Sequence, residues 1–133
     1  MKSAEYKIFD DLSFESKVVE TKQGKVEYHL SEGDGPVILI SHGGLGGLDQ
    51  ARVMASWVDD AKYRLLCPSR PGYLGTPLES GKTIEEQADL FAALLDVLKI
   101  DKVAIVTASA GGPPGYVFSI RHPDRVWALV GIG

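Results

Sequence analysis

Four stretches of the chain are apolar without interruption, and each is about as long as one β-strand. They are Val37–Ser41, Arg64–Ser69, Val103–Ser109 and Val126–Gly133. Their aliphatic residues do not alternate with polar ones, which is typical of strands buried on both faces. Strands of this kind belong to parallel sheets covered by helices, so the pattern predicts a parallel sheet from residue 37 onward.

Segments with helical periodicity lie between these strands. Thr83–Leu98 is the clearest, because Thr83 and Glu86 have the spacing of a capping box and a mostly apolar stripe recurs every three or four residues. Asp49–Val58 is predicted as an earlier helix, and Gly115–Arg121 as a later one ended by a proline. This alternation predicts an α/β fold with a doubly wound, mostly parallel sheet and right-handed crossovers.

The chain before the first buried strand has a different pattern. Lys17–Thr21 and Lys25–Ser31 are predicted as strands on either side of a short turn, and the second alternates as a strand with one wetter face does. Residues 1–16 are polar with scattered aromatics and are predicted to form a tail or a short helix. We interpret residues 1–133 as one domain, because the chain has no repeat and no low-complexity tract.

Composition narrows the classes of function. Apolar residues make up 44% of the 133 residues and charged residues 24%, as in ordinary globular domains, and the net charge of -4 argues against a nucleic-acid partner. Cys67 is the single cysteine, so neither an intrachain disulfide nor a cysteine zinc cluster is expected. The chain starts without a signal-peptide pattern and contains no apolar stretch of about 18 residues. We therefore expect a cytoplasmic protein without a membrane partner.

Glycines gather in three clusters, each of which begins where an apolar strand ends. The clusters are Ser41–Gly47, Ser69–Gly75 and Thr107–Gly112. In an open parallel sheet, ligands bind just beyond the carboxyl ends of the strands. Glycines also ease tight turns, which would account for one cluster more readily than for three. The three clusters together favour one shared site at this edge of the sheet.

Ser109 is the candidate nucleophile of this site. It stands between a buried strand and a predicted helix, with small residues on both sides. A sharp turn at such a point holds a serine in a strained conformation with its hydroxyl exposed, and the following helix N-terminus favours a developing anion. A serine in an ordinary turn is the alternative. The position after the strand favours the nucleophile.

The cluster SHGGLGG is a candidate oxyanion loop. We assign the N–H groups of Gly44 and Ala110 as the two donors to an oxyanion. A phosphate-binding loop is the competing interpretation, but the cluster lacks the features of both common nucleotide motifs, so no cofactor or metal is expected. His42 is expected to fix the loop through its ring rather than to act as a base. His29 and His122 are expected to be surface or capping residues.

These residues together resemble the α/β-hydrolase family over nearly the whole chain, from about residue 17 to residue 133. VILISHGG is similar to the family's third strand and oxyanion loop, SRPGYLGTP to its arginine- and glycine-containing loop, and VAIVTASAGG to its fifth strand and nucleophile elbow. The resemblance implies that Ser109 is the nucleophile, with Gly44 and Ala110 as oxyanion donors. Serine argues against the dehalogenating branch of the family, which uses aspartate. Thr107 departs from the family pattern, which has glycine there.

The resemblance also sets the order of the catalytic residues. In this family an acid and then a histidine follow the serine, whereas here only Asp124 and His122 do, in a turn expected at the opposite edge of the sheet. We therefore expect the N-terminal part of a longer hydrolase, an incomplete core ending at its sixth strand and inactive or weak alone. A homodimer through this strand, or a complementing C-terminal fragment, is predicted.

Two functions follow as alternatives from these observations. The first is serine acyl transfer on an ester, an amide or a similar small substrate, with Ser109 as the nucleophile. The second is a non-catalytic α/β module that serves binding or assembly. The presence of Ser109 and of the oxyanion loop favours the first function, and the lack of an acid and a base near Ser109 favours the second for this chain alone.

Overall fold

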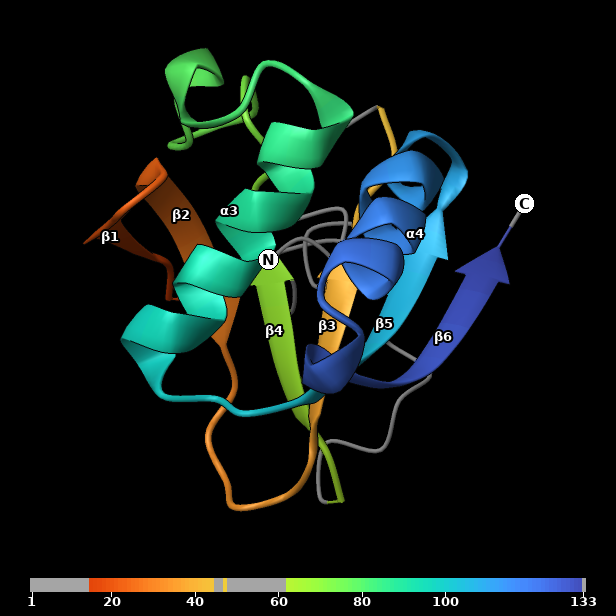
Figure 1. Cartoon of the computed structure of the whole chain (residues 1–133). Coiled ribbons are helices and arrows are strands. Elements are labelled where there is room, and N and C mark those ends of the chain that lie inside the picture. Colours follow the sequence, from red (N-terminus) through yellow and green to blue (C-terminus); the bar gives the residue numbers. More distant parts are fainter. Residues whose placement is uncertain (1–14, 45–46, 48–61, 133) are drawn as a thin grey trace, which may run out of the picture.

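The computed structural model describes residues 15–44, 47 and 62–132, and these residues form a six-stranded sheet in the order β1-β2-β4-β3-β5-β6 (Figure 1). The strands are β1 (Lys17–Thr21), β2 (Gly24–Leu30), β3 (Val37–Ser41), β4 (Arg64–Pro68), β5 (Val103–Ala108) and β6 (Val126–Ile132). β4, β3, β5 and β6 run parallel, while β1 and β2 form an antiparallel hairpin at one edge. The predicted α/β fold with a mostly parallel sheet is confirmed.

Both faces of β3, β4 and β5 are buried, as their unbroken apolar runs predict. The prediction is wrong for β6, whose residues are mostly exposed in this chain because the strand pairs on one side only. In β3, Leu39 packs into a cluster with the helices, whereas Ile38 and Ile40 face the opposite side. The cluster on that opposite side also contains Leu65 and Cys67 of β4. Successive side chains of a strand point to opposite faces, so a strand buried on both faces has no polar position to alternate.

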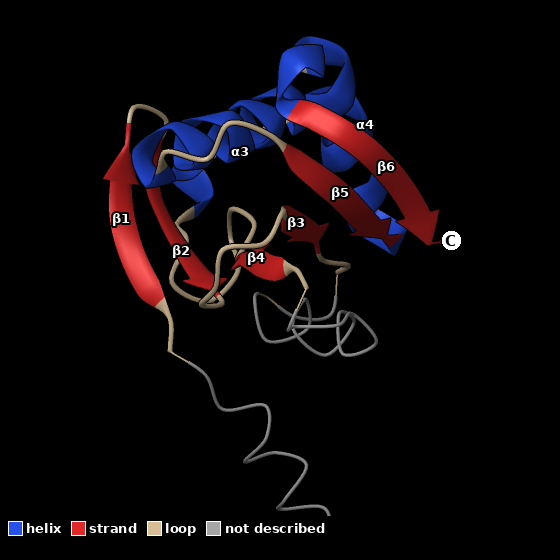
Figure 2. Ribbon diagram, turned by 90° about the horizontal axis from the view of Figure 1, so that it is seen from below, coloured by secondary structure: helices blue, strands red, loops and turns tan. Residues whose placement is uncertain are grey.

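Helix α3 (Ile84–Leu98) covers one face of the sheet and begins as the sequence predicts. Thr83 is its N-cap, and its hydroxyl accepts from the N–H of Glu86 at 3.1 Å while the Glu86 carboxylate accepts from the N–H of Thr83 at 3.2 Å. This capping box satisfies two N–H groups that no helical carbonyl can reach. Figure 2 shows α3 and α4 on the same side of the sheet, where Phe91 and Phe118 meet edge to face.

Helix α4 (Gly112–Arg121) starts earlier than the predicted Gly115. Pro113 and Pro114 lie in its first turn, where a missing N–H leaves no helical hydrogen bond unmade. The two prolines therefore belong to the helix start and do not delay it. His122 is the C-cap residue of this helix, and its N–H donates to the carbonyl of Phe118 at 2.8 Å.

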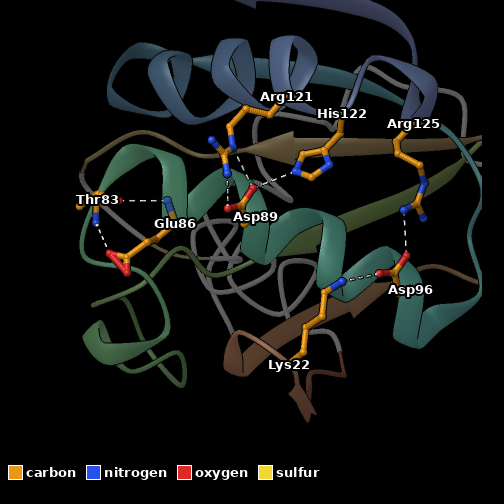
Figure 3. A network of polar contacts seen from close by, with 8 residues as sticks. All are labelled: Lys22, Thr83, Glu86, Asp89, Asp96, Arg121, His122 and Arg125. Carbon is orange, nitrogen blue, oxygen red and sulfur yellow. Dashed lines mark hydrogen bonds and ion pairs between the residues drawn. The ribbon is translucent and has the colours of Figure 1, made fainter.

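Two charged clusters join α3 to the segment around the end of α4 (Figure 3). Asp89 on α3 accepts from Arg121 at 2.9 and 2.7 Å and lies 2.9 Å from Nε2 of His122. The Arg121 hydrogen bonds, with a smaller contribution from His122, hold the pKa of Asp89 below its ordinary value. Farther along α3, Asp96 accepts from Arg125 at 2.8 Å, and this contact lowers the pKa of Asp96.

Some predictions fall on residues outside this description. The predicted helix Asp49–Val58 and most of the predicted N-terminal tail or short helix, residues 1–14, lie outside the described residues. Among the helices that the structure does describe, none has both the length and the apolar character needed to span a membrane. The described residues also contain no group of three His, Cys, Asp or Glu side chains suited to a metal ion.

Candidate active site

Ser109 occupies a strained, exposed position at the end of β5. Its φ angle is +48°, in the left-handed region that residues other than glycine rarely adopt. The short 3₁₀ helix η2 (Ser109–Gly111) carries the chain directly from the strand into α4. Left-handed backbone lets the chain reverse within one residue. The serine side chain therefore stands exposed at the C-terminal edge of the sheet.

The residues around Ser109 are small because backbones approach closely there. A Cβ atom on Gly111 would collide with the carbonyl oxygens of Ser41 and His42 at the end of β3. The hydroxyl of Ser41 donates to the carbonyl of Gly111 at 2.8 Å and ties the two segments together. The turn at Ser109 is thus fixed directly against the loop that follows β3.

Thr107 replaces the family's glycine without disrupting this turn. It is buried, and its methyl group lies against Gly115 of α4, where any side chain would collide with it. Gly131 of β6 is close to the Thr107 hydroxyl on the other side. Two glycines on neighbouring elements therefore provide the room that the branched side chain needs.

Gly44 and Ala110 lie side by side next to Ser109. A Cβ atom placed on Gly44 would be 3.9 Å from Cβ of Ala110 and 3.8 Å from Oη of Tyr73. Both residues are exposed, and within the described part of the chain neither backbone N–H has a hydrogen-bond acceptor. Ala110 is in the first turn of η2, where N–H groups have no helical acceptor. Two donors are therefore open beside an exposed serine.

His42 is completely buried and fixes the loop after β3. Its Nδ1 lies 2.7 Å from the carbonyl oxygen of Gly43, and its Nε2 lies 2.8 Å from the backbone nitrogen of Arg70. The Arg70 N–H can only donate, so Nε2 accepts and Nδ1 carries the proton that is donated to Gly43. A ring engaged at both nitrogens has no lone pair for catalysis, which confirms that His42 holds the loop.

Arg70, in the loop after β4, is the residue that the sequence did not single out. It is buried, with its Nε donating to the carbonyl of His42 at 2.9 Å and its Nη1 to Oε1 of Gln87 at 3.0 Å. Burial lowers the pKa of the Arg70 guanidinium, and the neighbouring Tyr73 opposes this shift. The signal in the sequence was an arginine inside one of the glycine clusters, but its partners are backbone carbonyls, which no motif displays.

Glu27 of β2 anchors the same loop from its other side. The carboxylate of Glu27 accepts from the hydroxyl of Ser69 at 3.2 Å and from the N–H of Gly75 at 3.0 Å. The N–H of Glu27 in turn donates to the hydroxyl of Thr76 at 2.8 Å. These contacts hold the loop after β4 against β2, while Arg70 joins it to the loop after β3 and Ser41 joins that loop to the turn at Ser109. The three glycine clusters therefore converge on one edge, as predicted.

The remaining histidines lie away from Ser109. His122 and Asp124 precede β6, at the end of β5 marked by Val103, which is separated from Ser109 by about 20 Å of extended chain. Their predicted place at the opposite edge and the capping role of His122 are confirmed. His29 lies within β2, opposite Cys67, and is partly exposed, in agreement with the expected surface position.

Comparisons with known proteins agree with this geometry. Residues 36–133 match the family described as the alpha/beta hydrolase fold. A hydrolase of Bacillus subtilis, YcgS, is 36% identical over 106 residues, which are 80% of this chain and 37% of YcgS. Haloalkane dehalogenase 2 of Mycobacterium tuberculosis is 29% identical over 122 residues, which are 88% of this chain and 41% of the enzyme.

A solved structure is similar over the same region. The alpha/beta hydrolase fold protein from Nakamurella multipartita superposes with a TM-score of 0.84 and 43% identity, covering 88% of this chain and 40% of that protein. The present chain therefore spans about two fifths of the length of the relatives that it matches. The match to the family, together with the sheet order and the turn at Ser109, shows that the chain belongs to the α/β-hydrolase family.

Proposed function

We propose that this chain carries the nucleophile and the oxyanion hole of a serine hydrolase. The observation that carries the proposal is the left-handed backbone of Ser109, which is exposed at the C-terminal edge of the sheet beside the open N–H groups of Gly44 and Ala110. An exposed serine held in strain beside two free donors is the arrangement that acyl transfer requires.

The reaction follows from this arrangement. Oγ of Ser109 attacks a carbonyl carbon, a general base takes the hydroxyl proton, and the carbonyl oxygen becomes negatively charged between the two N–H groups. The base then returns the proton to the departing alcohol or amine, and water releases the acyl group in a second round. We propose an ester, an amide or a similar small molecule as the substrate, because serine rather than aspartate stands at position 109.

The base and its acid come from outside the described residues in this proposal. His42 is engaged at both nitrogens, and His122 lies at the other end of β5. We propose that a complementing C-terminal segment, or a partner chain, supplies them. Serine without a base is a weak nucleophile, so the chain alone is expected to be slow.

Covalent labelling tests the proposal directly. The purified chain is treated with a fluorophosphonate probe, and Ser109→Ala is compared with Ser119→Ala, a control serine on α4 whose hydroxyl donates to the carbonyl of Gly115. Labelling that is lost in the first variant and kept in the second supports the proposal. Labelling that persists in Ser109→Ala contradicts it.

A non-catalytic module is the second candidate, and the positions of the histidines favour it. Both His42 and His122 are committed to structural contacts in this chain. Absence of labelling in the folded chain, both alone and with the portion of a full-length relative that this chain does not match added in trans, would select this function over hydrolysis.

A further inference from the structure

We infer that Arg70 is a positioning residue of the oxyanion hole. It holds the peptide group between Gly43 and Gly44 and thereby orients the Gly44 N–H. The inference rests on the proposed function, because it names the device that aims one of the two donors. Arg70 touches no part of the exposed edge itself: its guanidinium is buried behind the loop and contacts the carbonyl oxygens of His42 and Gly43.

The geometry of one peptide unit carries the argument. The carbonyl of Gly43 and the N–H of Gly44 belong to the same peptide plane, and a trans peptide directs them oppositely. The Gly43 oxygen accepts from Nδ1 of His42 at 2.7 Å and from Nη2 of Arg70 at 3.4 Å. Donors that hold this oxygen toward the interior therefore direct the Gly44 N–H outward, where Ala110 lies.

The neighbouring peptides are held by the same loop. Nε of Arg70 donates to the carbonyl of His42 at 2.9 Å, and the hydroxyl of Tyr73 lies 3.4 Å from the carbonyl oxygen of Gly44. The backbone N–H of Arg70 binds the ring of His42, whose edge packs against Tyr73 with ring centroids 4.7 Å apart. The side chains of Arg70 and Tyr73, in the loop after β4, thus contact the three consecutive carbonyl groups of residues 42 to 44.

The restraint is anchored in the body of the fold. The Arg70 guanidinium also donates to Gln87 on α3 at 3.0 Å and lies 5.2 Å from the ring centre of Tyr73. Among the described residues, no carboxylate oxygen lies within 4.0 Å of Arg70. Burying a cation among neutral groups reduces the stability of the fold, and an apolar side chain in the same space would reduce it less. The positive charge behind the loop favours the anion that forms in front of it.

Two substitutions separate positioning from simple support of the fold. Arg70→Lys keeps the charge but loses the fork that contacts two carbonyls, and Tyr73→Phe removes the hydroxyl at Gly44 but keeps the ring against His42. Arg64→Met is the matched control, because Arg64 is a half-buried arginine at the opposite end of β4 whose Nε donates to the carbonyl of Ser31. All are made in the full 133-residue chain.

The first readout is the rate of fluorophosphonate labelling, separated into probe affinity and the rate of the covalent step. We expect Arg70→Lys to slow the covalent step by about tenfold to a hundredfold, with probe affinity unchanged within about twofold. Arg64→Met should label as the unsubstituted chain does. A loss of probe affinity alone in Arg70→Lys would overturn the inference. An equal loss of labelling rate in Arg70→Lys and Arg64→Met would overturn it too.

The second readout does not depend on activity. Selective ¹⁵N labelling of the glycines gives one amide signal for each of the 15 glycines, and Gly44→Ala identifies the signal of Gly44. We expect Arg70→Lys and Tyr73→Phe to shift or broaden the Gly44 signal while that of Gly115 keeps its position. An unchanged Gly44 signal in both variants contradicts the inference. A shifted Gly44 signal in a chain that does not react with the probe, even with the complementing portion of a full-length relative added, would keep the positioning role of Arg70 and reject the hydrolase proposal.

Discussion

The methyl group of Thr107 occupies the space that a side chain at Gly115 would need. This contact joins β5 to α4 immediately below the turn at Ser109, so the pair sets how closely the helix approaches the strand. A branched residue at 107 is therefore compatible with the sharp turn only while position 115 has no side chain.

We expect Gly115→Ala to destabilise the chain by about 1–3 kcal/mol through overpacking, partly offset by the better helix propensity of alanine. Urea unfolding followed by circular dichroism measures the loss. Thr107→Ala in the same chain removes the colliding methyl group and should restore most of the stability. A double variant no more stable than Gly115→Ala would show that the contact does not limit the approach of α4.

Left-handed backbone at Ser109 costs free energy that glycine would not incur. We expect the free energy of unfolding of Ser109→Gly, measured in urea, to exceed that of Ser109→Ala by about 1 kcal/mol, because alanine retains the strain. Lys99 has φ of +58° at the end of α3, far from the site, so Lys99→Gly is the control that should gain stability and leave labelling unchanged. Equal stability of the glycine and alanine variants at 109 would mean that the turn stores no strain.

Asp89 makes stability depend on acid pH. Its pKa is lower in the folded chain than in the unfolded one, chiefly because Arg121 donates to it, so the unfolded state binds more protons near pH 4. The stabilisation from ionised Asp89 is complete above the pKa of about 3.9 that aspartate has in the unfolded chain. It is lost as the pH falls through the lower pKa of Asp89 in the folded chain. Asp89→Asn should therefore reduce the difference in unfolding free energy between pH 7 and pH 3.

The exposed carboxylate of Asp124, outside the two charged clusters, provides the control for that measurement. Asp124→Asn is unfolded at the same two pH values for comparison. The expected contribution of the Asp89 pair at pH 7 is small, because both partners are partly exposed and solvent screens the pair. A pH dependence that Asp89→Asn does not alter would assign the acid sensitivity to other carboxylates.

A homodimer through the edge strand β6 stays a prediction. Trp127 and Leu129 are 50% and 41% exposed on this edge strand, which pairs with β5 on one side. Exposed apolar edge strands associate with other strands, so light scattering at high concentration should show a dimer. Trp127→Lys should give a monomer, and Ile120→Lys, at an exposed position on α4, should remain dimeric. A monomer of the unsubstituted chain would defeat the prediction.

The sequence predicted the strands and the capped helix well because their signals are local. The apolar runs and the spacing of Thr83 and Glu86 are visible in a few consecutive residues, and the turn at Ser109 follows from the strand that precedes it. The start of α4 was predicted three residues late, because Gly112, Pro113 and Pro114 have low helix propensity although a first turn accommodates them. The buried contacts of Arg70 could not be predicted, because most of its partners are backbone oxygens of a loop distant in the sequence and the other is Gln87 on α3.

The order of strands has a consequence for how the site assembles. β3 precedes both of its neighbours in the chain yet lies between them, and the hydroxyl of Ser41 reaches a carbonyl 70 residues later. Contacts of such long sequence separation form late in folding, because their loop-closure entropy must first be overcome. A nascent chain therefore exposes β3 with one side unpaired until β5 has emerged. We therefore expect the loop at Gly44 and the turn at Ser109 to become ordered together, because the Ser41 hydroxyl bonds the carbonyl of Gly111.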